Sequence, residues 1–217
     1  KYNIPKNAKI LDIGCAGAVF LTELKRQGYT DLYALDYSPE AIEVAKANGI
    51  HNAFVMDGHD PKFEPETFDV IISSDSLEHL EDDMKALRNW HTILKKNGMG
   101  FILVPAYNFL WSEHDDVNYH FRRYTTKELK IKTLSAGYKV LATNYYYSLI
   151  FIPTAIVRLT MKLFKKKKKQ EEEANGQILM LPGFVNKSLI TFQKIENAIS
   201  KHIKMPFGVS ACVIVTK

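Results

Sequence analysis

The feature that most constrains the fold of this chain is an alternation of strand-like and helix-like segments through its first two-thirds. Five short runs are apolar and rich in β-branched residues, which is typical of strands buried on both faces: residues 10–13, 32–35, 53–56, 68–72 and 100–104. Three segments of helical period separate them: residues 19–26, 39–48 and 82–95. Repeated strand–helix–strand units predict a parallel sheet covered by helices on both faces. We therefore expect a doubly wound α/β fold.

Local signals agree with these boundaries. Ser38 precedes Pro39, so one helix has both a capping hydroxyl and a proline at its first position. Helix ends are predicted at Gly28, Gly49 and Gly98, because glycine is the residue most often found just past a helix. A further helix is expected at 125–135, and two more strands at 139–147 and 209–216.

About 60 residues separate these last two strands, whereas a hairpin loop needs only about 2 to 5. We therefore expect residues 148–207 to form a helical insertion that acts as a lid or an attachment surface. Within it, residues 165–176 are rich in Lys and Glu and are predicted to be a flexible loop. The sheet domain would comprise residues 1–147 and 208–217.

Composition sets the class of protein. The chain has 217 residues, of which 46% are hydrophobic and 24% charged, which indicates a globular domain and excludes a disordered or collagen-like chain. Two cysteines, Cys15 and Cys212, are too few for a disulfide scaffold and favour a reducing compartment, although one disulfide stays open. No signal peptide is visible after Lys1. We expect a cytoplasmic protein.

The strongest local motif is the turn after the first strand, Asp12-Ile13-Gly14-Cys15-Ala16-Gly17. Such a small-residue turn lets backbone N–H groups and a helix N-terminus approach a ligand. Asp36 ends the second strand, where a carboxylate can accept both hydroxyls of a ribose. Asp57 and Gly58 follow the third strand. Because open α/β sheets bind ligands at the carboxyl ends of their strands, these residues predict an adenosine-type ligand.

These motifs also carry a family resemblance, because they follow one another in its order and spacing. The motifs are residues 10–14, Leu35-Asp36-Tyr37-Ser38-Pro39, Met56-Asp57-Gly58, and residues 68–73 with Leu77-Glu78-His79-Leu80; residues 95–100 resemble the approach to a fifth strand. Through them, the chain from about residue 9 to residue 137 resembles the class I S-adenosylmethionine-dependent methyltransferases.

The resemblance implies a seven-stranded, mostly parallel sheet whose last strand is antiparallel, with S-adenosylmethionine lying over the first two strands. S-adenosylhomocysteine is then the product. The residues expected to bind the cofactor are Asp12, Gly14, Cys15, Ala16, Asp36, Tyr37, Asp57, Gly58 and Ser74.

The chain departs from the family at two positions of the turn. Family members usually carry glycine where Ala16 and Ala18 stand, and alanine does not readily adopt a positive φ. Weakened cofactor binding, or a non-catalytic relative that binds a partner or a membrane surface, therefore stays an alternative. A nicotinamide site is disfavoured because its Gly-x-Gly-x-x-Gly pattern needs glycine at Ala16 and Val19.

The loop after the fifth strand, residues 105–124, carries more chemistry than a connector needs. It resembles a loop in a subgroup of bacterial and archaeal methyltransferases. We predict His114 as general base with Asp115 orienting it. Contacts to the acceptor are predicted for Trp111, His120, Arg122, Arg123 and Tyr124. For each of these residues the alternative is a hydrogen bond or ion pair that ties the loop to the sheet.

The segment after the fourth strand is a candidate metal site. Asp75-Ser76-Leu77-Glu78-His79 resembles the metal-binding run of ubiquinone-biosynthesis O-methyltransferases, and two carboxylates with an imidazole can hold a divalent ion. Leu-Glu-His also occurs in metal-free relatives, and no second histidine cluster completes the site in the sequence. We expect no bound metal, and acids that favour the start of a helix.

The most apolar stretch, residues 145–164, leads from the strand at 139–147 into the insertion. Its uncharged part is too short for a membrane span. Its uncharged run ends before Arg158, whereas a span needs about 20 residues. From Thr154 onward Arg158, Lys162 and Lys165 share one helical face, while Ile156, Leu159 and Leu163 share the other. Residues 186–203 are a second amphipathic helix, with Leu189, Phe192, Ile199 and Ile203 on one side. We expect the two helices to pack together and roof the acceptor pocket.

Positive charge is concentrated in the same insertion. The net charge is 29 − 24 = +5, and Lys162 with Lys165–Lys169 contributes six charges, so the rest of the chain sums to 5 − 6 = −1. Contact of residues 154–169 with an anionic membrane surface is the alternative to packing on the sheet or on a second subunit. Nucleic acid is not expected, because Glu171–Glu173 offset half of the lysine run. The sequence thus predicts methyl transfer to a small-molecule acceptor, elongated or partly apolar, such as a lipid-linked or sugar-linked metabolite.

Overall fold

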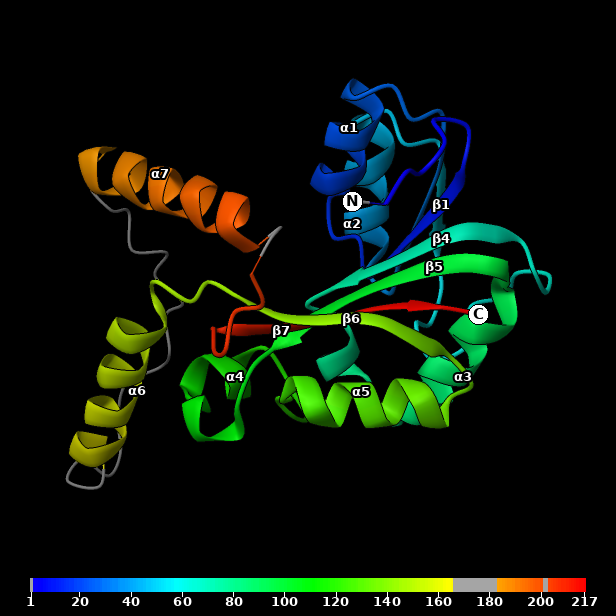
Figure 1. The fold of residues 1–217 in the computed structure, drawn as a ribbon. Helices are drawn as coiled ribbons and strands as arrows, with labels where there is room; N and C mark the ends of the chain where they lie inside the picture. The colour runs from blue at the N-terminus through cyan, green and yellow to red at the C-terminus, as the bar shows by residue number, and fades with distance from the viewer. Residues whose placement is uncertain (1, 166–182, 201–202) are drawn as a thin grey trace.

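The computed structural model describes residues 2–165, 183–200 and 203–217, which form one open sheet covered by helices (Figure 1). The strands are β1 (Lys9–Ile13), β2 (Asp31–Asp36), β3 (Asn52–Val55), β4 (Phe68–Ser74), β5 (Leu94–Pro105), β6 (Lys139–Tyr146) and β7 (Ser210–Thr216). Their order is β3-β2-β1-β4-β5-β7-β6, and β7 runs antiparallel to both of its neighbours. The predicted seven-stranded, mostly parallel sheet with an antiparallel last strand is confirmed.

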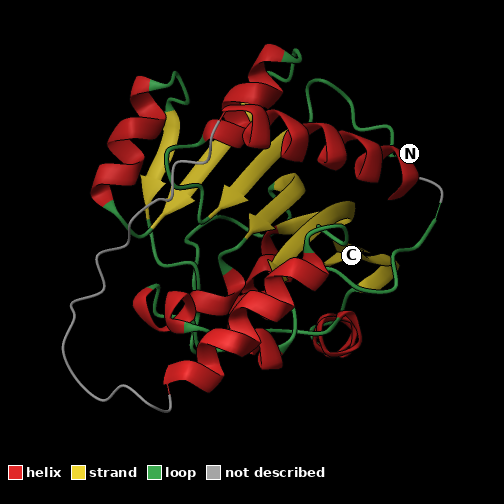
Figure 2. Ribbon diagram, turned by 90° about the vertical axis from the view of Figure 1, so that its left-hand side faces the viewer, coloured by secondary structure: helices red, strands yellow, loops and turns green. Residues whose placement is uncertain are grey.

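Helices cover both faces of the sheet (Figures 1 and 2). On one face lie α1 (Val19–Arg26) and α2 (Pro39–Ala47), and on the other α3 (Asp83–Ile93) and α5 (Thr126–Ser135). Buried apolar side chains form one cluster beneath each pair of helices. Shorter elements occupy the connections: η1 (Leu77–His79), η2 (Asn108–Leu110) and α4 (Glu113–Val117).

Two of the three predicted glycine helix ends are confirmed. Gly28 and Gly49 follow α1 and α2 with φ of +92° and +83°. The prediction for Gly98 is wrong, because α3 ends at Ile93 and Gly98 lies within β5. There its carbonyl accepts hydrogen bonds from the Thr216 hydroxyl and the Lys217 N–H, so pairing with the last strand replaces the expected cap.

The insertion leaves the sheet after β6 and returns at β7, as predicted. It contains α6 (Phe151–Lys165) and α7 (Gly183–Ser200), which project beyond the strand ends in Figure 1. The buried carboxylate of Glu196 in α7 accepts the N–H groups of Ser148 and Leu149, just before α6 begins. Residues 166–176 of the predicted flexible loop lie outside the described residues. In the part that is described, no helix is long and apolar enough to cross a membrane.

The faces of the insertion helices differ from expectation. In α6, Arg158 turns toward the loop after β5, and its guanidinium donates to the Leu110 carbonyl at 2.7 Å. Ile156 and Leu159, predicted to share the helical face opposite the charges, are exposed. The two helices lie apart in Figure 1, so the predicted packing of one against the other is wrong. Polar contacts hold both helices to the body, and in α6 the ring of Phe151 also packs against Tyr107 and Phe207. Further along each helix, large apolar side chains are exposed.

Candidate cofactor and acceptor site

The turn after β1 is built around one glycine. Gly14 has φ +75°, and the N–H groups of Gly14 and Cys15 both donate to the Leu35 carbonyl, at 2.8 and 3.1 Å. A Cβ at Gly14 would stand 2.4 Å from the Cβ of Ser76, which follows β4. The glycine is therefore required both by its backbone conformation and by the close approach of a neighbouring segment.

Ala16 and Ala18 have φ of +48° and +54°, in the left-handed region that favours glycine. The structure thus retains the backbone shape of a glycine-rich turn while carrying side chains at both positions. Ala16 is held by a hydrogen bond from its N–H to Oδ2 of Asp36, at 2.8 Å. The turn and the end of β2 are consequently locked together.

Asp36 fits the predicted ribose contact. Oδ2 accepts from Ala16 and Oδ1 from the Ser38 N–H at 3.0 Å, which fixes the orientation of the carboxylate. Each oxygen keeps a further lone pair, so two neighbouring hydroxyls of one ligand can still bind. The side chain of Tyr37 is exposed beside it.

The other acids at this edge differ in environment. Burial raises the pKa of the Asp12 carboxyl to about 7, and the charge of Asp36 adds to that rise. Asp57 is more open to solvent and accepts both the N–H and the Nδ1 of His59, each at 2.8 Å. Asp12, Asp36 and Asp57 therefore lie at the carboxyl ends of β1, β2 and β3, the edge at which open α/β sheets bind ligands, and Asp36 contacts the turn directly.

Cys15, Gly58 and Ser74 have less direct support. Cys15 is buried and carries a free thiol, as does Cys212. The Gly58 carbonyl accepts the indole N–H of Trp90 at 2.7 Å, a contact that anchors α3 to this loop. Ser74 ends β4, and its hydroxyl donates to Asp75 at 3.3 Å. Their contact with the cofactor stays a prediction.

A cavity of about 390 Å³ opens beyond β4 and β5. Most of the residues that line it are polar or charged, and they come from the ends of β4 and β5, η1, the loop after β5, α6 and the segment that enters β7: Asp75, Glu78, His79, Pro105, His114, Asn118, His120, Arg123, Arg158, Val209 and Ser210. Three of the predicted acceptor-loop residues, His114, His120 and Arg123, are thus brought together on one wall.

Asp115 is the centre of this wall. Its fully buried carboxylate accepts Nε of Arg123 at 2.7 Å, Nδ1 of His120 at 2.9 Å and the Ser112 N–H at 2.8 Å. Nη1 of Arg158 lies 3.5 Å from Oδ2 of Asp115, whereas Arg123 and His120 both bind Oδ1. Burial alone would raise the pKa of Asp115, but the hydrogen bonds from Arg123 and Ser112 lower it to about 2. The carboxylate therefore stays charged and fixes its partners.

The predicted His114–Asp115 pair is not formed. Asp115 orients His120, while Nδ1 of His114 lies 3.2 Å from the amide nitrogen of Asn118. That amide also donates to the His114 carbonyl at 2.6 Å, so the tautomer assigned from these bonds carries its proton on Nε2. His114 is therefore placed as a donor to the cavity, and His120 as the imidazole with a free lone pair. Burial lowers the pKa of His120, which keeps that ring neutral at neutral pH.

Three predicted acceptor contacts point elsewhere. Arg122 and Tyr124 both bind Asp83 of α3, through an ion pair of 3.0 Å and a hydrogen bond of 2.9 Å. The indole N–H of Trp111 donates to Asp116 at 2.8 Å. None of the three lines the cavity. Arg122 and Tyr124 tie the loop to α3, and the Trp111 hydrogen bond lies within the loop. Structural bonds of this kind were the alternative to acceptor contact, although the predicted anchor was the sheet.

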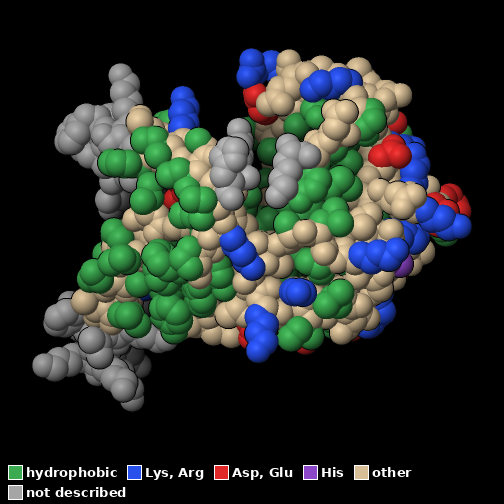
Figure 3. Space-filling view, in the orientation of Figure 1, with side chains coloured by type: hydrophobic (Ala, Val, Ile, Leu, Met, Phe, Trp, Pro, Cys, Tyr) green, Lys and Arg blue, Asp and Glu red, His purple; other side chains and the backbone are tan. Residues whose placement is uncertain are grey.

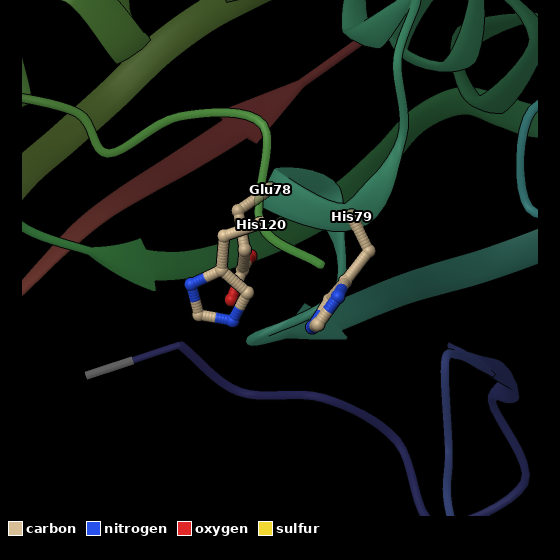
Figure 4. A group of neighbouring side chains, drawn as sticks. All are labelled: Glu78, His79 and His120. Carbon is tan, nitrogen blue, oxygen red and sulfur yellow. The ribbon is translucent and has the colours of Figure 1, made fainter. Parts of the chain in front are cut away.

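The run from Asp75 to His79 gains a partner that the sequence did not indicate. Glu78 and His79 project from η1 and His120 from the loop after β5, with one ligand atom of each within 4.8 Å of the others (Figure 4). The fold thus brings one distant histidine beside a run for which the sequence offers no second histidine cluster. Burial raises the pKa of Glu78 to about 8, and the charge of Asp75 acts in the same direction.

Sequence reasoning also missed Asn118, Arg158 and Ser210 as cavity residues. Arg158 carried a signal, because it is the first charge in an otherwise apolar helix. Ser210 begins the last strand, and its place beside η1 depends on the strand order, which local sequence does not encode.

Comparison with known proteins agrees with the fold and the turn. Residues 11–102 match the model of a family described as a methyltransferase domain. Residues 11–102 therefore resemble a methyltransferase domain, and the antiparallel β7 and the Gly14 turn facing Asp36 agree with a class I domain that uses S-adenosylmethionine as its cofactor.

Among curated relatives, the chain is similar to EEF1A lysine methyltransferase 2 of Danio rerio, with 32% identity over 119 residues, 49% of this chain and 51% of that protein. It is 35% identical to ubiquinone biosynthesis O-methyltransferase of Pelagibacter ubique over 101 residues, 45% of this chain and 42% of that protein. The chain spans about half the length, or less, of these relatives.

A solved structure of phosphoethanolamine N-methyltransferase 2 of Haemonchus contortus, in complex with S-adenosyl-L-methionine, shares the fold. The TM-score is 0.63 at 13% identity, covering 99% of this chain and 50% of that one. The names of these three proteins refer to different acceptors, so the comparisons support a methyltransferase domain and indicate no substrate.

Proposed function

We propose that this protein transfers the methyl group of S-adenosylmethionine to a small molecule bound in the cavity of about 390 Å³. The observation that carries the proposal is the position of that cavity. It opens at the carboxyl ends of β4 and β5, on the same sheet edge as Asp36, and its lining residue Asp75 directly precedes Ser76, which lies against Gly14. The cofactor supplies the electrophilic methyl group, and the protein's part is to hold the acceptor in line with it and away from water.

The lining favours an oxygen or nitrogen acceptor. Such a group must lose a proton when it is methylated, and His120 offers a lone pair that Asp115 orients. His114 presents a donor that can hold the acceptor, and the guanidinium groups of Arg123 and Arg158 favour an acceptor that carries negative charge.

Calorimetric titration with S-adenosylmethionine and S-adenosylhomocysteine tests the cofactor half of the proposal. Asp36→Ala should weaken binding by about tenfold or more, the ratio that corresponds to about 1.4 kcal/mol. Asp31→Ala, at the opposite end of the same strand, is the matched control and should leave affinity unchanged. Equal affinity of the two variants would show that the ribose lies elsewhere. Release of S-adenosylhomocysteine in the presence of candidate acceptors then tests transfer itself.

A second proposal concerns location: the insertion attaches the enzyme to an anionic membrane surface, so that its acceptor is partly apolar or lipid-linked. In α6, the side chains of Ile152, Ile156, Val157, Leu159 and Met161 are 43% to 62% exposed. Figure 3 shows hydrophobic side chains gathered on the side where α6 and α7 project. Between Ser148 and Lys169 the sequence contains Arg158 and lysines but no acid. An exposed apolar face flanked by positive charge is typical of helices that lie on anionic bilayers.

Sedimentation with lipid vesicles tests this second proposal. Binding should be stronger to vesicles containing phosphatidylglycerol than to pure phosphatidylcholine, and weaker at high salt. Ile156→Asp should reduce binding, whereas Ile131→Asp, an equally exposed isoleucine on α5, should not. If both variants bind like the unmodified protein, the apolar face of α6 does not contact lipid.

A further inference from the structure

A buried carboxylate without a partner lies beside two imidazoles at the edge of the acceptor cavity. The side chain of Glu78 is 0% exposed, and neither of its oxygens has a hydrogen-bond partner among the described residues. The positively charged group that acts on it, Arg123, forms its hydrogen bonds with Asp115 and the Ala106 carbonyl instead. Burying a charge without a partner is costly, so this carboxylate requires either a proton or a cation.

His120 is held as a metal-binding histidine usually is. Its Nδ1 is paired with the buried carboxylate of Asp115 at 2.9 Å, which leaves Nε2 as the lone-pair nitrogen. Metal-ligating histidines almost always donate their other ring N–H to a carboxylate, a carbonyl or water, because that bond fixes both tautomer and ring orientation. The ring of His79 meets that of His120 edge-on, with centroids 4.5 Å apart.

The spacing of the three groups suits a single ion. Their ligand atoms lie within 4.8 Å of one another (Figure 4). Ligands about 2.0 to 2.2 Å from one zinc ion are at most about 4.4 Å apart, so side-chain shifts of some tenths of an ångström bring all three into range. Two imidazole nitrogens and one carboxylate oxygen favour a zinc-like ion, whereas magnesium favours a shell of oxygens.

We propose that Glu78, His79 and His120 bind one divalent ion of the zinc type, with Asp115 as the positioning residue for His120. The three ligands come from η1 and from the loop after β5, and all three line the cavity, so the remaining coordination position faces the acceptor space. Metal binding itself is independent of methyl transfer. Where the ion is present, it takes the place of His120 as the group that activates an acceptor hydroxyl, a role that rests on the proposed function.

Titration of the chelator-treated, tag-free protein with zinc chloride tests the site. The unmodified chain should bind one zinc ion. Glu78→Gln and His120→Gln should each weaken that binding by about tenfold or more, since loss even of an outer residue costs 10- to 100-fold. His51→Gln, an exposed histidine next to β3, is the matched control and should bind like the unmodified chain.

A second measurement keeps the test valid if Glu78→Gln, a change at a buried residue, prevents folding. Cobalt substituted for zinc should give visible absorption bands, and these should change in His79→Gln, where the replaced side chain is exposed and outside the core. Failure of the unmodified protein to bind zinc, or equal affinities of the Glu78→Gln and His51→Gln variants, would overturn the proposal.

The same metal-free protein is titrated with S-adenosylmethionine in parallel. Zinc binding without cofactor binding would contradict the methyltransferase proposal alone, and cofactor binding without zinc binding would contradict the metal site alone.

Discussion

At the scale of single residues, Ala16 and Ala18 adopt the left-handed backbone conformation that glycine usually provides in such a turn. A non-glycine residue in the left-handed region costs roughly 1 to 2 kcal/mol. Ala18 is buried, so its methyl group has packing partners, but Ala16 is exposed. The strain at Ala16 is therefore not offset by burial of its side chain.

Ala16→Gly should accordingly stabilise the fold by up to about 1 kcal/mol, because relief of the left-handed strain exceeds the entropy that glycine loses on folding. The same change in a right-handed helix, Ala41→Gly in α2, should destabilise by about 0.5 to 1 kcal/mol. Urea unfolding of both variants measures the difference. Destabilisation at both positions would show that the φ of Ala16 carries no strain.

The buried carboxyl of Asp12 makes stability depend on pH. Its pKa rises from 3.8 to about 7 on folding, so the native state holds a proton that the unfolded chain releases above pH 3.8. The penalty is absent below that pH, grows as the pH rises, and is complete above about 7, with an upper limit of about 4 kcal/mol. Asp12→Asn should therefore gain stability relative to the unmodified protein between pH 5 and pH 8. Urea unfolding without cofactor at several pH values checks this, and a pH-independent difference would contradict it.

Residues near one another in sequence were predicted better than residues brought together by the fold. The Gly14 turn and Asp36 follow from local pattern, since each directly ends a strand. Asp115, by contrast, lies next to His114 in sequence but binds His120, because a short helix separates their directions. The sequence suggested that adjacent His114 and Asp115 pair. In the short helix α4 their side chains instead point in different directions, and Asp115 binds His120.

At the scale of elements, the loop after β5 is fixed from both sides. Asp115 cross-links the inner side of the loop through His120 and Arg123 and lies 3.5 Å from Arg158 of α6. On the outer side, Asp83 of α3 binds Arg122 and Tyr124 of the loop and also Lys132 of α5. The sequence indicated that this loop was chemically loaded. It did not indicate which side chains faced the cavity, because that depends on how α3 and α5 pack against the sheet.

Tyr124→Phe should therefore act on stability rather than on the acceptor. It removes a buried hydrogen bond to a carboxylate, worth about 1.5 to 3 kcal/mol. Tyr119→Phe is the matched control, because the Tyr119 side chain is 82% exposed, and its effect should stay within about 0.5 kcal/mol. Urea unfolding compares the two, and cofactor affinity should be unchanged in both. If the two variants were equally stable, the hydroxyl of Tyr124 would not be supporting the loop.

At the scale of the whole molecule, the cofactor edge and the insertion lie at opposite ends of the sheet. The residues predicted to bind the cofactor follow β1, β2 and β3, while the insertion joins β6 to β7, and β4 and β5 lie between. The cavity lies beyond β4 and β5, and α6 reaches it through Arg158 alone among its described residues. The sequence predicted the place of the insertion from the chain length between two strands, but not which helix faces would be exposed.

Replacement of residues 150–206 by about four residues should then separate cofactor binding from membrane attachment. It leaves about ten residues between the paired Tyr146 and Ser210, which is enough to join two antiparallel strands. The β6–β7 ladder, which extends to the pair Tyr146 and Ser210, brings the cut ends together. Affinity for S-adenosylmethionine should change by less than tenfold, or about 1.4 kcal/mol, because Asp36 and Gly14 are untouched. Binding to anionic vesicles should be lost. Calorimetry, vesicle sedimentation and circular dichroism of the shortened protein measure these outcomes, and a folded variant that no longer binds the cofactor would show that the insertion shapes the far edge of the sheet as well.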